Sequence, residues 1–161
     1  MAVEAYQRYG PALVRKARRV LQSRADAEDV VHGLFVDLLA DPAPILDLPY
    51  LYRAVTHRCL TLLRNHETRA RLLAANEPEL RGPVRTRADE RVIDLDLLGK
   101  LVEELDDAHV EALVYRFFDD LTLEEIAELT GVSRKTIGHR LGRVQSAVSA
   151  LSTPRPQGGF S

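Results

Sequence analysis

"LTLEEIAELTGVSRKTIGHRL", residues Leu121 to Leu141, predicts two short helices joined by a turn. Thr122 followed by Glu125 three residues later is the pattern of a capping box, so the first helix is expected to begin there. "TGVS" predicts the turn, and Ser133 is expected to cap the second helix. Together these signals predict a helix-turn-helix.

The second helix of this stretch carries bases and no acid. Its apolar seam consists of Ile137, Leu141, Val144, Val148 and Leu151. At 100° per residue the opposite face holds Lys135, His139, Gly142 and Ser146, with Arg143 beside them and Arg134 and Arg140 flanking the seam. A helix that lies in the DNA major groove needs one buried edge and one basic edge. An ordinary amphipathic helix is the simpler interpretation, but the short helix and the glycine turn before it favour DNA binding.

Gly138 and Gly142 stand inside this helix, and each costs it roughly 1 kcal/mol relative to alanine. One interpretation is that they let the helix approach DNA or a protein closely. The other is that base-reading side chains are simply missing there. In both cases the contacts that distinguish one base from another would be left to Lys135, Thr136, His139 and Arg143.

The composition is that of a globular, cytoplasmic protein. Of 161 residues, 45% are apolar and 29% are charged, with a net charge of -2 and one cysteine, Cys59. No apolar run reaches the roughly 20 residues that span a bilayer, and the N-terminus lacks the pattern of a signal peptide. Residues 94–128 hold 12 acids and 2 bases, so nucleic acid would bind through local basic patches.

The remainder of the chain predicts an all-α fold without a strand pattern. Helical stripes include Leu13, Ala17, Val20 and Leu21, with Pro11 near a helix start, and Val30, Val31, Leu34, Phe35, Leu38 and Leu39, with Asp26 as cap. "YLYRAVTHRCLTLLRN" places Arg53, His57, Thr61 and Arg64 on one face and Cys59 in the core. We expect two small helical domains, 1–65 and 94–151, joined by a flexible linker, 66–93, and followed by a disordered tail, 152–161.

Three separated motifs, "ARRVLQSRADAEDVVHGLF", "LYRAVTHRCLTLLR" and "YRFFDDLTLEEIAELTGVSRKTIGHRLGRV", resemble the extracytoplasmic-function (ECF, group IV) sigma factors. The resemblance covers residues 5–151, with the motifs in the family's order. It implies that the first domain docks on the clamp helices of core RNA polymerase and captures the single-stranded minus-ten element. It implies that the second domain reads the minus-thirty-five duplex and sits on the polymerase flap. An anti-sigma factor is a further possible partner.

The resemblance assigns residues to each surface. The minus-thirty-five surface would comprise Ser133, Arg134, Lys135, Thr136, His139, Arg140 and Arg143. The minus-ten surface would comprise Tyr50, Tyr52, Arg53, His57, Thr61 and Arg64, beside the loop 41–50 that receives a flipped base. The polymerase surface, on the helix 26–40, would comprise Asp26, Asp29, His32, Gly33, Val36 and Asp37.

The chain departs from the family at two places. Many relatives carry Trp at the position of Pro49 or Tyr50, and this chain has no Trp. Many carry Asn where His57 stands.

Other functions remain open. A metal site of His57, Cys59 and His66 is disfavoured because offsets of 2 and 9 share no helical face, and no metal or other cofactor is expected. No phosphate loop or nucleophile–base pair indicates an enzyme. The alternatives are a helix-turn-helix regulator that works without polymerase, and a sigma-fold protein that titrates a partner.

Overall fold

The computed structural model describes residues 2–41, 46–76 and 95–152, all of whose regular elements are helical. The prediction of an all-α fold is therefore confirmed for these residues. The helices, in chain order, are α1 (Ala2–Leu21), α2 (Arg24–Ala40), α3 (Leu48–Asn76), α4 (Leu95–Glu104), α5 (Asp107–Leu113), the π-helical turn η2 (Val114–Phe118), α6 (Leu123–Thr130) and α7 (Arg134–Ser152).

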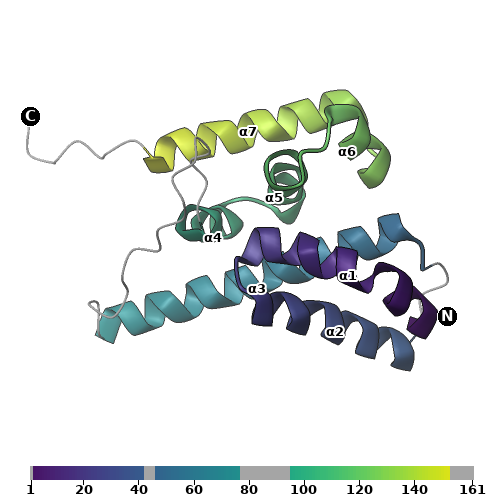
Figure 1. The fold of residues 1–161 in the computed structure, drawn as a ribbon. Helices are drawn as coiled ribbons and strands as arrows, with labels where there is room; N and C mark the ends of the chain where they lie inside the picture. Colours follow the sequence, from purple (N-terminus) through teal and green to yellow (C-terminus); the bar gives the residue numbers. More distant parts are fainter. Residues whose placement is uncertain (1, 42–45, 77–94, 153–161) are drawn as a thin grey trace, which may run out of the picture.

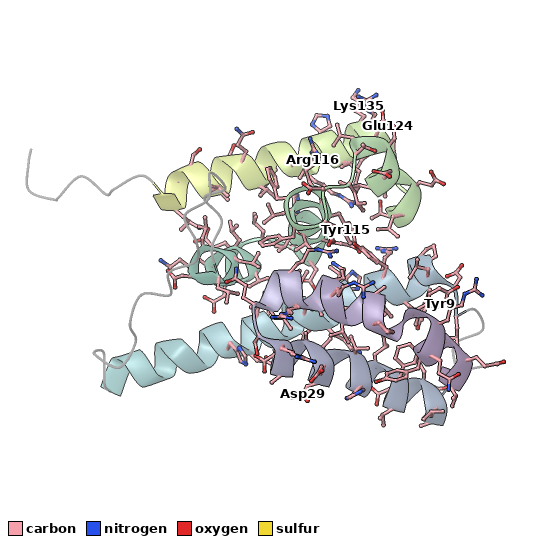
Figure 2. All side chains as sticks on the ribbon, viewed as in Figure 1. Tyr9, Asp29, Tyr115, Arg116, Glu124 and Lys135 are labelled. Atoms are coloured by element: carbon pink, nitrogen blue, oxygen red, sulfur yellow. The ribbon has the colours of Figure 1, made fainter. Side chains whose placement is uncertain are left out.

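The helices form two layers, as Figure 1 shows. Helices α1 and α2 pack together and α3 packs on both, while α7 rests on α4, α5 and α6. Helices α4 and α5 lie between α7 and α3, so the C-terminal helices α4–α7 are seated directly on the N-terminal helices α1–α3. Tyr115 of η2 lies in this contact, with its ring 5.9 Å from that of Tyr52 (Figure 2).

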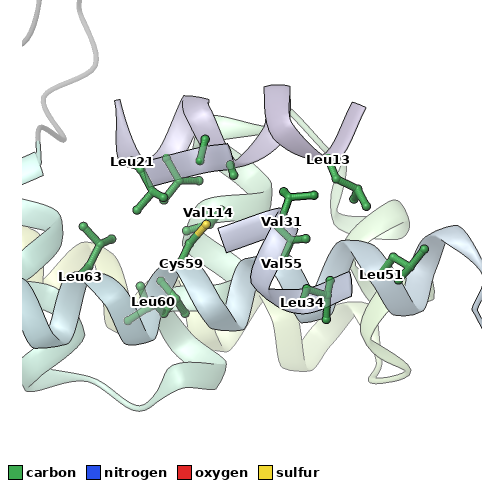
Figure 3. Packing of buried hydrophobic residues seen from close by; sticks show 14 of the residues in the cluster. Leu13, Leu21, Val31, Leu34, Leu51, Val55, Cys59, Leu60, Leu63 and Val114 are labelled. Carbon is green, nitrogen blue, oxygen red and sulfur yellow. The ribbon is translucent and has the colours of Figure 1, made fainter. Parts of the chain in front are cut away.

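One buried apolar cluster runs through both layers. Leu13, Val55 and Cys59 of the N-terminal helices and Val110 and Val114 of the C-terminal helices are all fully buried in it. Figure 3 shows Val114 among the side chains of α1–α3. A smaller cluster of Tyr115, Ile126 and Ile137 fixes α6 and α7 to η2. Because buried apolar surface contributes about 25 cal/mol per Å², the contact between the layers is part of the stable fold.

Several local predictions need correction. Helix α1 begins at Ala2, so Pro11 lies inside it and not near its start. Helix α2 is capped by Ser23, whose hydroxyl accepts from the backbone N–H of Asp26, so Asp26 is not the cap. Leu39, expected in the buried stripe, is 60% exposed.

The expected boundary regions lie largely outside the described residues. Helix α3 continues through the first part of the expected linker, to Asn76. The rest of that linker and the tail fall on residues 77–94 and 153–161, which the structure does not describe. Among the described helices, none combines the length and the apolar content that crossing a membrane requires.

Candidate nucleic-acid interfaces

The helix-turn-helix has the local geometry that its sequence predicts. Thr122 and Glu125 form the complete capping box at the start of α6. Gly131 ends α6 with φ at 76°, a left-handed conformation that glycine adopts without strain. Ser133 caps α7 by accepting the backbone N–H of Thr136 at 3.1 Å, as expected. The turn is thus fixed at both ends by short-range hydrogen bonds.

The outer face of α7 is open to solvent. Lys135, His139 and Arg143 are exposed, and Lys135 lies on the outer side of the C-terminal helices in Figure 2. Arg140 is half-exposed, and Arg134 is engaged by Glu124 at 3.0 Å. The structure thus brings together the basic side chains that sequence reasoning placed on this face, although Ser133 and Thr136 bond to each other.

Gly138 and Gly142 are not required by packing within the chain. A Cβ atom added at either position would meet no described atom within 4 Å. The exposed side of α7 therefore has two positions without a side chain, and packing within the described residues does not explain the choice of glycine there.

The α3 basic face comprises Arg53, His57, Thr61 and Arg64. Its three basic side chains are paired with acids of α5 and remain partly exposed. Arg53 donates to both carboxylate oxygens of Glu111, at 2.8 and 3.3 Å, and His57 lies 3.3 Å from the same carboxylate. Arg64 pairs with Asp107. The resemblance implies that this face follows an exposed DNA strand, whereas in the structure acids of α5 pair with its charges. Thr61 is exposed and donates to the His57 carbonyl.

Glu111 is the centre of this contact and is only 3% exposed. Burial by itself raises the pKa of a carboxyl group, but hydrogen bonds from His57, Arg53 and Tyr115 outweigh it and lower the pKa of Glu111 to about 2. The hydrogen bond to Glu111 is also the main cause that raises the pKa of His57. Glu111 therefore stays ionised at neutral pH and favours a protonated His57.

The contact between His57 and Glu111 is expected to make the stability of the fold depend on pH. Since the pKa of His57 is raised in the fold, its contribution is fully present below pH 6.5 and is lost as pH rises through the raised pKa. Glu111 and Arg53 keep their charges across that window, because the pKa of Glu111 is lowered and the pKa of Arg53 is raised. We expect the parent to melt higher than His57→Asn at about pH 5.5, and the gap to close by about pH 8.5. Thermal melts of both proteins across this range test it; a gap independent of pH would contradict it.

The two tyrosines of the expected minus-ten surface differ in environment. Tyr50 is 42% exposed, next to Asp47, which accepts its backbone N–H. Tyr52 is half-buried beside Tyr115, with the Lys16 ammonium 4.6 Å from its ring centre. Only Tyr50 therefore offers an open ring for stacking, and most of the loop before it, residues 42–45, lies outside the described residues.

The expected polymerase surface on α2 mixes charge with exposed apolar side chains. Asp29 is exposed on the side of α2 away from the C-terminal helices (Figure 2). Val36 is 62% exposed, and Leu39 lies near it in sequence at 60%. Asp37 pairs with Arg58, whose guanidinium also lies beside Gly33.

The other members of that surface are less available. His32 hydrogen-bonds Tyr6, and Asp26 is half-buried at the start of α2. The exposed apolar pair, Val36 and Leu39, thus lies on the same helix as the exposed Asp29, His32 and Asp37. An exposed apolar patch with a charged rim is typical of a protein interaction site.

Sequence reasoning missed a buried charged cluster between the layers. Lys16 of α1 is fully buried and donates to Asp119 at 2.8 Å, and Arg19 donates to the other Asp119 oxygen at 2.7 Å. The Lys16 ammonium also lies over the rings of Tyr52 and Tyr115. Burial lowers the pKa of Lys16, against the attraction of Asp119. The signal was present, because Lys16 stands three residues after Leu13 on the buried stripe of α1.

Comparison with known proteins finds two matching family models. Residues 5–69 match the family model described as Sigma-70 region 2, and residues 101–144 match the one described as Sigma-70, region 4. By these two domains the chain belongs to the sigma factors. No curated protein gives a significant sequence match.

A solved structure shares the fold. The sigma factor RpoE of Bartonella quintana, crystallised with the anti-sigma factor NepR, superposes with a TM-score of 0.50 at 18% identity. The match covers 94% of this chain and 97% of that one. The likeness therefore extends over both layers of helices.

Proposed function

We propose that this chain is an ECF-type sigma factor that binds core RNA polymerase and directs promoter recognition and transcription initiation. Region 4 would read duplex DNA through α7, and region 2 would capture single-stranded DNA along α3 and dock on polymerase through α2. It would make or break no bond, would need no cofactor, and would work in the cytoplasm. The exposed basic face of α7, in the same chain as a region 2 domain, carries this proposal.

The alternatives differ in which exposed surfaces they require. A regulator that works without polymerase has no use for the exposed Asp29, Val36 and Leu39 on α2. A protein that only titrates a partner has no use for exposed bases on α7. An anti-sigma factor is a reasonable regulator of this chain, since RpoE of Bartonella quintana was crystallised with one.

Run-off transcription tests the proposed function. The purified chain is added to core polymerase on a library of promoter fragments, and discrete transcripts that need both proteins are expected. Transcription without the chain, or tight sequence-selective DNA binding without polymerase, would favour a different class of protein.

Arg143 tests the minus-thirty-five surface. Arg143→Ala removes an exposed guanidinium from the outer face of α7 and should cost about 1–3 kcal/mol if that group reads a base. Preference at one promoter position should then relax, whereas a phosphate contact would weaken all promoters alike. Gln145→Ala is the matched control, since residue 145 is also exposed but about 200° around the helix. Unchanged transcription from every promoter variant would remove Arg143 from the DNA surface.

Asp29 tests the polymerase surface. Asp29→Arg should leave the fold intact, because a substitution at an exposed site usually changes stability by about 0.5 kcal/mol or less. It should weaken polymerase binding, because a like charge at an interface can cost several kcal/mol. Co-purification with core polymerase measures this, and Glu104→Arg, an equal charge change at an exposed position of α4, is the control. Parental binding by a folded Asp29→Arg protein would show that polymerase contacts another face.

A further inference from the structure

A cavity of about 520 Å³ lies between α1 and the start of α2, on residues that none of the proposed surfaces uses. Figure 1 shows the two helices side by side. The volume is within the range of small-molecule sites, about 300–1,000 Å³. The cavity walls contain three arginines, Arg15, Arg18 and Arg24, and one acid, Glu28. The cavity is therefore suited to an anionic ligand.

Two of the three guanidinium groups have no acidic partner in the fold. Arg15 and Arg18 are exposed, and neither forms an ion pair with a residue that the structure describes. Arg24 lies 3.5 Å from Glu28, but these side chains are 73% and 44% exposed, so water screens the pair. A guanidinium binds a phosphate through two parallel N–H donors. Three such groups around one cavity fit a ligand with more than one phosphate.

The ring of Tyr6 lies at the other end of the cavity and has one uncovered face. A Cβ atom at Gly10 would lie 3.6 Å from Cδ2 and Cε2 of Tyr6 and 3.7 Å from Cγ, distances so similar that the atom would sit over the ring face. Glycine leaves that face bare. The Tyr6 hydroxyl hydrogen-bonds His32, and Phe35 packs edge-on at 5.1 Å, so the ring is held in place. A fixed ring with a bare face can stack on a flat ligand group.

Gly10 and Pro11 are unfavourable in a helix interior, yet α1 runs through both. Glycine loses backbone entropy, and proline has no N–H to donate to the carbonyl of Gln7. Packing does not require glycine, because a Cβ at position 10 would meet the Tyr6 ring only at ordinary van der Waals distance. All three of these α1 residues line the cavity. A bound ligand explains why local helix preference is given up at this place.

We propose that this cavity binds a nucleoside polyphosphate, with the base stacked on Tyr6 and the phosphates on the three arginines. Tyr6 and Arg15 are nine residues apart on α1, or roughly 14 Å at the rise of an α-helix, which is comparable with the extended length of a nucleoside triphosphate. Pro11 and Val14 lie between them and face the sugar. The cavity has the size of one small molecule, which favours a free nucleotide over a nucleic-acid strand. All lining residues belong to α1 and α2, so the inference does not depend on the DNA surfaces proposed for α3 and α7.

Calorimetric titration of the full chain at low salt tests the ligand class. The probes are ATP, GTP, inorganic triphosphate and adenosine. We expect at least one nucleotide to bind roughly 10-fold or more tightly than triphosphate, because stacking adds to the phosphate contacts. Adenosine, which lacks the phosphates, should give no measurable heat. If neither nucleotide binds, or if triphosphate binds as tightly as both, the inference is wrong.

Gly10→Ala tests the stacking surface without removing any charge. The new methyl group covers the Tyr6 ring face, so nucleotide affinity should fall by about 5-fold or more, whereas triphosphate affinity should not change. The melting temperature should stay or rise, because alanine favours a helix more than glycine does. A glycine needed only for folding would give the opposite pattern, with a lower melting temperature and equal weakening of both probes. Parental nucleotide affinity in this variant would contradict the proposed stacking.

Arg18→Ala tests the phosphate contacts against a matched control. It should weaken the nucleotide and triphosphate alike, by about 10-fold. Arg8→Ala makes the same charge change on the same helix at an exposed residue that lies over the Tyr9 ring and not in the cavity wall, so binding should fall by less than about 2-fold. Equal weakening by both variants would show a general charge effect and would refute the site. If single-stranded DNA of mixed sequence binds more tightly than either nucleotide and depends on Arg18 in the same way, the cavity is a nucleic-acid contact and the nucleotide assignment fails.

Discussion

Replacing Asp119 with alanine is expected to weaken the contact between the N-terminal and C-terminal helices by about 3–5 kcal/mol. The substitution leaves the Lys16 ammonium buried, with the Tyr52 and Tyr115 rings beside it and no carboxylate to balance it. A buried charge without its partner costs far more than an exposed one. Water reaches Lys16 once the two layers of helices separate. The cost therefore falls on the form in which the layers are in contact, the closed form, and not on the helices themselves.

A shift of this size changes the ratio of closed to open chain by about a hundredfold to a few thousandfold. X-ray scattering should show a larger radius of gyration, and the melting temperature should fall, while far-UV circular dichroism keeps its helical signal. Glu128→Ala removes an exposed carboxylate from the same group of helices and should change neither. A parental radius and melting temperature for Asp119→Ala would mean that Lys16 is neutral or otherwise satisfied.

The helix-turn-helix could be predicted from sequence because its determinants are local. Thr122 bonds Glu125, and Ser133 bonds Thr136, each three residues away. The left-handed turn needs only Gly131. Apolar spacing likewise placed Ile137 and Val144 on the buried side of α7. Contacts of this kind are set within one or two helical turns, so a single sequence contains them.

The layer contact could not be predicted, because its partners are far apart in the chain. Lys16 and Asp119 are 103 residues apart, and Arg53 and Glu111 are 58 apart. Periodicity shows that Arg53, His57 and Arg64 share a face, but it does not say what covers that face. Residues 15–24 contain five bases, and charge runs of this kind are usually solvated. In the structure Lys16 is buried, whereas the other four, Arg15, Arg18, Arg19 and Arg24, are exposed. A lysine on a buried stripe needs a carboxylate, and only the fold identifies which one.

The exposed apolar residues on α2 illustrate a different limit. Leu39 fits the helical stripe because it follows Phe35 by four residues, and Phe35 is only 5% exposed. Leu39 nevertheless lies open at the end of α2, together with Val36. Periodicity cannot separate a core residue from an interface residue, because both are apolar and both recur at helical spacing. The distinction requires knowing where the neighbouring helices end.

Replacing the buried pair by apolar residues, Lys16→Met with Asp119→Leu, is expected to act in the opposite direction from Asp119→Ala. A buried ion pair loses much of its attraction to desolvation, so well-packed apolar side chains of similar size are often neutral or more stabilising by about 1–4 kcal/mol. Arg19 loses Asp119 in this variant, but its side chain is 45% exposed and water can take over its hydrogen bonds. The closed form should therefore gain population and the melting temperature should rise.

If the closed form is inactive, the double variant should initiate less transcription, because it stabilises that form. A gain of about 1–4 kcal/mol corresponds to roughly 5- to 1,000-fold less open chain, and run-off transcription should fall in the same direction. Lys16→Met alone is the intermediate control, since Arg19 still balances Asp119 at 2.7 Å. Single-stranded DNA binding by the free chain should weaken in parallel. A double variant that melts higher yet transcribes and binds DNA like the parent would show that the layers need not separate, because the α3 basic face would then be working while α5 covers it.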